Sequence, residues 1–140
     1  MKTKASVIIP EDPKFRPEEH EMTAAWILAK HYNCRVSFLR PITGYKIKTA
    51  DFVMKGVIWE LKSPISNSRR RCVSDRLSKA KAQSHNIVFD GRRTKINDEF
   101  LQKQLLTELD KRSSINRLLF ITKKLEVMSM KSDNVTLGGA

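Results

Sequence analysis

Three side chains that could act together on one substrate, Asp51, Glu60 and Lys62, lie within twelve residues of each other. Between them, Lys55 and Gly56 form a candidate two-residue turn of a β-hairpin, because glycine readily adopts positive φ. If those two residues are the whole loop, Asp51 lies opposite Glu60, and strand alternation places Lys62 on the same face. Opposed like charges normally destabilise a sheet. The facing carboxylates therefore predict a positive group between them, either a divalent metal ion or an ammonium group.

The same residues also have an ordinary interpretation. Asp51 could lie in a loop, and Glu60 and Lys62 could form a solvated ion pair, since Glu-x-Lys is common by itself. The complete arrangement is rarer, and it follows a segment rich in Lys and Thr and precedes a basic helix. This context favours the catalytic interpretation. Trp59 and Phe52 fall on the opposite face of the hairpin, where we expect them to pack in the core.

These residue types suit phosphodiester hydrolysis, which needs an activated water, an offset for the phosphate charge and a stabilised leaving oxygen. Mg²⁺ held by carboxylates contributes to all three, with Mn²⁺ as an alternative ion. Mg²⁺ prefers oxygen ligands and keeps several waters. We expect Asp51 and Glu60 to be direct ligands, with the main-chain oxygen of Leu61 as a third. Lys62 would orient the attacking water and offset charge on the phosphate.

Further candidates for the same cleft come from two predicted helices. Glu21 could reach the metal directly or through water if its helix packs against the hairpin, and the alternative is a charge that favours the helix N-terminus. The sequence does not decide between Glu21 and its neighbours Glu18 and Glu19. Gln83, at the end of the basic helix, could hold the scissile phosphate or a water. His85 could be an acid or base, but a lone histidine at a helix end more often lies at the surface.

The charge of this chain of 140 residues is strongly positive, with a formal net value of +12. It is concentrated between Lys62 and Lys95, where ten basic and two acidic residues give a net charge of +8. A basic segment beside a carboxylate pair predicts a polyanionic partner, most simply nucleic acid, and the alternative is a solubilising surface. Such contacts to phosphates set affinity without reading sequence. The residues expected to make them are Arg69, Arg70, Arg71, Arg76, Lys79, Lys81, Arg92 and Arg93.

Length and composition limit the class of protein. The length suits one domain, and 40% hydrophobic residues can build a core. The sequence contains no run of about eighteen apolar residues, and the apolar run near its start is too short for a signal peptide. We therefore expect no membrane partner and a cytoplasmic site of action. Two cysteines give neither a disulfide framework nor a metal-ligand spacing.

Hydrophobic periodicity predicts the elements that position these residues. We expect helices over about 17–32, 73–84 and 98–111, and strands over 35–39, 50–54, 57–62, 86–89, 117–122 and, at an edge, 124–130. A hairpin followed by helical crossovers gives an α/β domain with a central mixed β-sheet flanked by helices. Residues 1–15 are expected to be extended or flexible, 16–130 to form the single domain, and 131–140 to be a disordered tail.

The pattern resembles the PD-(D/E)XK nuclease superfamily. The resemblance runs from Glu21-x-x-Ala24-x-x-x-Leu28 through Thr49-Ala50-Asp51 to Trp59-Glu60-Leu61-Lys62-Ser63-Pro64. More narrowly, the chain is similar to the C-terminal nuclease domains of bacterial contact-dependent growth-inhibition toxins of the CdiA type, many of which cleave transfer RNA. Residues 83–90 and 120–122 also carry that likeness. One departure is Ala50, where family members often have proline before the aspartate.

The resemblance implies a metal-dependent endonuclease with a PD-(D/E)XK-like core, in which Glu21, Asp51 and the Glu60/Lys62 pair form the site. The narrower likeness favours RNA, transfer RNA in particular, as the substrate. A DNA endonuclease of the same superfamily and a non-catalytic nucleic-acid-binding module are the alternatives. A toxic nuclease needs an inhibitor, so an acidic immunity protein is an expected partner. Cleavage position, base preference and oligomeric state stay open.

Overall fold

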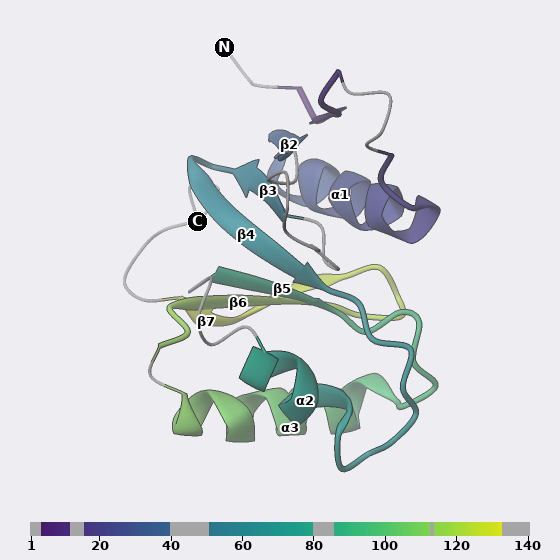
Figure 1. Ribbon diagram of the computed structural model, residues 1–140, viewed down its shortest axis with the longest axis vertical. Helices are drawn as coiled ribbons and strands as arrows, with labels where there is room; N and C mark the ends of the chain where they lie inside the picture. Colours follow the sequence, from purple (N-terminus) through teal and green to yellow (C-terminus); the bar gives the residue numbers. More distant parts are fainter. Residues whose placement is uncertain (1–3, 12–15, 40–50, 80–85, 113, 133–140) are drawn as a thin grey trace.

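The computed structural model describes residues 4–11, 16–39, 51–79, 86–112 and 114–132 (Figure 1). Helices and strands alternate along most of this part of the chain. In chain order they are β1 (Ser6–Ile8), α1 (Glu19–Tyr32), β2 (Arg35–Phe38), β3 (Asp51–Met54), β4 (Val57–Lys62), α2 (Cys72–Lys79), β5 (Asn86–Asp90), α3 (Asp98–Lys111), β6 (Arg117–Ile121) and β7 (Val127–Ser132).

The strands form one seven-stranded sheet in which spatial order equals chain order, from β1 to β7. The pairs β1–β2, β4–β5 and β5–β6 are parallel. The pairs β2–β3, β3–β4 and β6–β7 are antiparallel. In Figure 1, α1 lies on one side of the sheet and α2 and α3 lie on the other. The predicted α/β domain with a mixed sheet flanked by helices is confirmed.

Each face of the sheet has its own hydrophobic core, because strand side chains alternate between the faces. On one face, Phe52 and Trp59 pack with Leu28 of α1, and all three are fully buried. On the other face, Phe89 packs with Leu101 of α3. Phe52 and Trp59 are therefore core residues, as the hairpin alternation predicted. The two cores fix the sheet between its helices, so the faces of β3 and β4 are unambiguous.

The observed elements differ from the predicted ones mainly at the edges of the sheet. β1 lies within the segment expected to be extended or flexible, where Ser6–Ile8 pairs parallel with β2. β7 begins at Val127 rather than Lys124 and runs to Ser132, since Thr122 and Glu126 close a turn through a main-chain bond of 2.9 Å. Residues 133–140 lie outside the described residues. None of the described helices is long and apolar enough to cross a membrane.

Candidate active site

β3 and β4 form the predicted hairpin around a two-residue turn. Lys55 and Gly56 have φ of 56° and 74°, and two positive φ values mark the type I′ turn, whose twist matches that of the strands. The register pairs Met54 with Val57 next to the turn and advances one residue at a time along each strand to the last pair, in which Asp51 lies opposite Glu60. The turn therefore brings the two carboxylates together as the sequence predicted.

The Asp51–Glu60 pair is of the closely spaced type. The main-chain carbonyl of Asp51 accepts a hydrogen bond from the Leu39 amide at 2.9 Å, so the main-chain groups of Asp51 point to β2 and away from β4. Opposed residues that exchange no main-chain hydrogen bond lie nearest each other, with their side chains close. The same alternation directs the carbonyl of Leu61 toward the β3 side of β4. Two carboxylates and one carbonyl oxygen thus share this end of the hairpin.

A buried lysine is paired with one of the two facing acids. The Lys62 ammonium is 2.8 Å from Oε1 of Glu60, and the two residues are only 5% and 3% exposed. The ammonium group, one of the two positive groups predicted from the facing acids, is therefore present. Lys62 supplies one positive charge beside two carboxylates, so these three side chains together carry a net negative charge when both acids are ionised.

Asp51 shows the consequence of that imbalance. Burial, followed by repulsion from Glu60 and opposed by attraction to Lys62, raises its pKa from 3.8 to about 6. Its Oδ1 atom is buried and has no hydrogen-bond partner within the described part of the chain. A buried carboxylate oxygen without a partner is expensive, and an oxygen-seeking cation would relieve the cost. The donor set fits Mg²⁺ or Mn²⁺, which accept carboxylate and carbonyl oxygens and retain waters.

The site lies on the face of the sheet that α2 and α3 cover. Glu60 and Lys62 pair in register with Ile87 and Phe89 of β5, and both of those residues belong to the core beneath α2 and α3. Ile58, on the same face of β4 nearer the turn, is 54% exposed. Among the described residues, the helices therefore pack on this face at β5 and β6, and the exposure of Ile58 shows that β4 is open to solvent near its turn.

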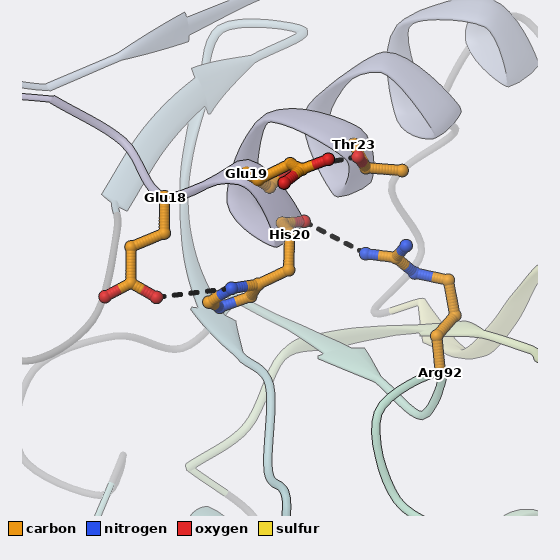
Figure 2. Close-up of a pocket in the computed structure, with 5 residues that line it drawn as sticks. All are labelled: Glu18, Glu19, His20, Thr23 and Arg92. Carbon is orange, nitrogen blue, oxygen red and sulfur yellow. Dashed lines mark hydrogen bonds and ion pairs between the residues drawn. The ribbon is translucent and has the colours of Figure 1, made fainter.

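Glu21 does not join this cluster. Its carboxylate accepts a hydrogen bond of 2.7 Å from the Glu18 amide at the start of α1, which packs on the opposite face of the sheet. In the described ranges, no three His, Cys, Asp or Glu side chains are grouped so that they could hold a metal ion. Glu21 thus takes the helix-terminal role that the sequence offered as the alternative to catalysis. Glu18 and Glu19 line an open pocket with His20, Thr23 and Arg92 (Figure 2).

The three arginines that precede α2, expected from the sequence to bind a polyanion, lie at the surface. Arg69, Arg70 and Arg71 are exposed, and Arg76 on α2 is half-buried. The guanidinium of Arg69 lies 5.2 Å from the centre of the Phe100 ring, which holds it against α3. Because α2 is on the same side of the sheet as the Asp51–Glu60 pair, these groups could hold the backbone of a strand that enters the site.

Arg92 and Arg93, which were expected to bind phosphate, both make contacts within the protein. Arg92 is bound to both oxygens of Asp90, at 2.9 and 2.7 Å, and donates to the His20 carbonyl at 2.9 Å. Arg93 is exposed but contacts the His20 ring at 3.0 Å and the Ser63 carbonyl at 3.3 Å. Arg92 is thus a structural residue. Sequence reasoning missed this role because His20 lies far away in the chain.

Other predicted residues cannot be placed. Lys81, Gln83 and His85 lie outside the described residues, and nothing is described of the Lys79 side chain. Their expected roles in phosphate binding and catalysis stay predictions.

Residues 48–127 match the protein family described as the contact-dependent growth inhibition CdiA C-terminal domain. This match covers more than half of the chain and includes Asp51, Glu60 and Lys62. The chain belongs to this family. A solved CdiA-CT/CdiI toxin and immunity complex from Burkholderia pseudomallei is similar in structure, with a TM-score of 0.62, 15% sequence identity, and coverage of 90% of this chain and 98% of that chain. At this identity the likeness shows the fold alone. No curated protein has a matching sequence.

Proposed function

We propose that this CdiA C-terminal domain is a metal-dependent endonuclease of the PD-(D/E)XK type that acts as a toxin on RNA, transfer RNA in particular. Family membership supports the toxin role. The observation that carries the nuclease role is the facing Asp51–Glu60 pair, in which a buried Asp51 oxygen has no hydrogen-bond partner within the described residues and Lys62 contacts Glu60. The proposed substrate implies a cytoplasmic site of action.

Each residue of the cluster has a role in this proposal. Asp51, Glu60 and the Leu61 carbonyl would hold Mg²⁺ or Mn²⁺, which when bound supplies positive charge to the phosphate and increases the acidity of water. The Lys62 ammonium, fixed 2.8 Å from Glu60, would donate to the attacking water or to a phosphate oxygen. In that role its charge would lie where negative charge develops during hydrolysis, an arrangement that lowers the barrier effectively.

Two other functions are compatible with parts of the site. A DNA endonuclease would use the same cluster, and the exposed arginines before α2 would hold either nucleic acid because phosphate contacts do not read sequence. A non-catalytic binding module would use the arginines alone. It predicts binding that weakens with salt and no cleavage with any divalent ion.

An acidic immunity protein is the partner we propose. The structural neighbour was solved as a toxin and immunity complex, and the net charge of +12 of this chain would attract an acidic protein. A partner that covered the exposed arginines and the accessible end of the β3–β4 face would exclude the substrate. Its association rate should fall steeply as salt is added.

The test is a cleavage assay on transfer RNA, total RNA, and single- and double-stranded DNA, with Mg²⁺ or with excess EDTA. We expect Mg²⁺-dependent cleavage of RNA, and loss of about 10²–10³-fold in rate for Glu60→Gln while binding persists. The matched control is Glu108→Gln. Glu108 on α3 is also buried, with 6% exposure, and its carboxylate is also ion-paired, 3.4 Å from the Arg112 guanidinium. Full cleavage in EDTA, or wild-type activity of Glu60→Gln, would contradict the proposal, whereas preferred cleavage of DNA would select the first alternative.

A further inference from the structure

A closed ring of hydrogen bonds joins the carboxyl ends of β4 and β5 to the first turn of α1. The Ser63 hydroxyl donates to Asp90 at 3.4 Å, and Asp90 is bound by Arg92. Arg92 donates to the main-chain carbonyl of His20 at 2.9 Å, and Arg93 contacts the His20 ring at 3.0 Å. Arg93 completes the ring by donating to the Ser63 carbonyl at 3.3 Å. Three elements distant in sequence are thus connected.

The partners of the His20 ring define its tautomer. A guanidinium can only donate, so Nε2 of His20 accepts from Arg93 and the proton lies on Nδ1. Nδ1 is 3.3 Å from a carboxylate oxygen of Glu18, toward which the ring is directed in Figure 2. Both ring nitrogens are therefore engaged, and the neutral imidazole is the form that satisfies both contacts.

The ring of hydrogen bonds begins at the residues that follow the last β4–β5 pair, next to the candidate active site. Lys62 pairs with Phe89 at the end of the β4–β5 ladder, and the next residues on the two strands are Ser63 and Asp90, two members of the ring. After Ser63 the chain leaves the sheet and has no strand partner up to the turn before α2. Ends of strands fray unless they are tied. The ring of hydrogen bonds ties Ser63, the residue next to Lys62, and the bonds from Thr94 to Ser66 and from Lys95 to Asn67 tie the chain farther on.

We propose that His20 and Arg93 are positioning residues for Lys62. By holding Ser63 they fix the end of β4, and thereby keep the Lys62 ammonium on Glu60 and aligned with the accessible face of the hairpin. This inference rests on the proposed nuclease function. It assigns Arg93 a role other than the phosphate contact expected from the charge of the sequence.

The kinetic test uses Arg93→Ala, His20→Leu and His20→Gln in the full chain. A displacement of about 1 Å in a catalytic group costs up to about 10²-fold in rate, so we expect kcat to fall at least about tenfold in Arg93→Ala and His20→Leu with KM unchanged. His20→Gln should retain most of kcat, because its amide oxygen can accept from Arg93 in place of Nε2. His31→Leu, in the last turn of the same helix, is the matched control and should equal the wild type.

The salt dependence of KM separates positioning from phosphate binding. A lost phosphate contact would raise KM and reduce the slope of log KM against log salt by about one. That result for Arg93→Ala, or a wild-type kcat for His20→Leu, would overturn the inference. An unchanged slope with lowered kcat supports it.

A second measurement does not require cleavage, so it separates failure of this inference from failure of the proposed function. Amide hydrogen exchange should be at least about tenfold faster at Lys62 in His20→Leu or Arg93→Ala than in the wild type or His31→Leu. Unchanged exchange at Lys62 in a folded Arg93→Ala protein would overturn the positioning role even if the wild type cleaved no nucleic acid. Arg93 is exposed, so that variant should fold.

Discussion

Asp51 is the residue whose surroundings say most about the chemistry of this domain. Burial and the facing Glu60 raise its pKa to about 6, and Lys62 only partly offsets them. A divalent cation would remove both costs at once, since it replaces lost solvation and neutralises the repulsion between the acids. Perturbed carboxyl groups of this kind concentrate at functional sites. The raised pKa and the unpartnered oxygen of Asp51 support its proposed role as a cation ligand.

Without divalent ions, Asp51 should make stability depend on pH. Its folded pKa of about 6 exceeds the ordinary 3.8, so the folded state binds this proton more tightly than the unfolded state. That stabilisation is complete below about pH 4 and is lost as the pH rises through 6. At pH 8 we expect the free energy of unfolding of Asp51→Asn to exceed that of the wild type by about 1–2 kcal/mol. This value is discounted for the partial solvent access of Asp51.

Urea unfolding in EDTA at pH 4 and pH 8 measures this difference. The two proteins should have the same free energy of unfolding at pH 4 and diverge at pH 8. Equal differences at both pH values would mean that Asp51 titrates normally in the folded protein.

At the residue scale, the sequence predicts contacts that depend on local geometry and misses those that depend on packing. Asp51 and Glu60 meet because a two-residue turn and strand alternation determine their register. Glu21 and Arg92 were assigned to the site and the polyanion surface from their type and charge. Glu21 instead accepts from the Glu18 amide at a helix start. Arg92, paired with the nearby Asp90, donates to the His20 carbonyl because α1 begins beside the carboxyl end of β5.

The β3–β4 hairpin is the element on which the site depends, and its turn adopts a conformation that few residues favour. A Cβ atom added at Gly56 would meet nothing within 4 Å. The left-handed backbone, with φ of 74°, is therefore the only obstacle to a side chain there. Lys55 adopts the same region without the freedom of glycine, at a conformational cost that asparagine would reduce.

We therefore predict opposite effects for two turn substitutions. Gly56→Ala should lower the free energy of unfolding by about 1 kcal/mol, and Lys55→Asn should raise it by about 0.5 kcal/mol, because Asn-Gly is favoured in type I′ turns. Urea unfolding measures both changes, and cleavage by Lys55→Asn should equal that of the wild type. A neutral Gly56→Ala would show that the turn does not require the left-handed conformation.

At the element scale, long periodic segments were predicted well and short edge segments were not. α3 spans the predicted residues because its leucines repeat with the period of a helix and Asn97 caps it by accepting from the Phe100 amide. β1 has only three residues, too few for alternation to be seen. Its strand character comes from its parallel partner β2, which the local sequence cannot reveal.

Across the whole molecule, some basic residues are exposed and others are paired within the protein. The count of basic residues predicted one surface for nucleic acid, but the fold places Arg69, Arg70 and Arg71 before α2 and turns Arg92 toward α1. The exposed arginines lie on the same side of the sheet as Asp51 and Glu60. A count of basic residues cannot make this division, because it depends on which side chains meet partners in the folded protein.

The exposed arginines should control affinity and its salt dependence. Changing Arg70 and Arg71 together to alanine should raise KM and reduce the slope of log KM against log salt by about two, with kcat unchanged. The matched control changes Lys103 and Lys124 to alanine, which removes the same charge from other exposed positions. Kinetics between 50 and 200 mM salt, a range over which phosphate contacts have large effects, measure the slopes. Equal changes in both double variants would indicate only a non-specific effect of net charge.

The most direct test of the central claim, that the hairpin brings Asp51 and Glu60 together to hold a cation, is calorimetric titration of Mn²⁺ into the free protein near pH 6. The wild type should bind the ion and release protons, since binding requires an ionised Asp51. Asp51→Asn and Glu60→Gln should each bind at least about tenfold more weakly, as loss of a direct ligand requires, while Glu108→Gln should bind normally. Equal affinity in all four proteins, or no binding by the wild type, would contradict the account.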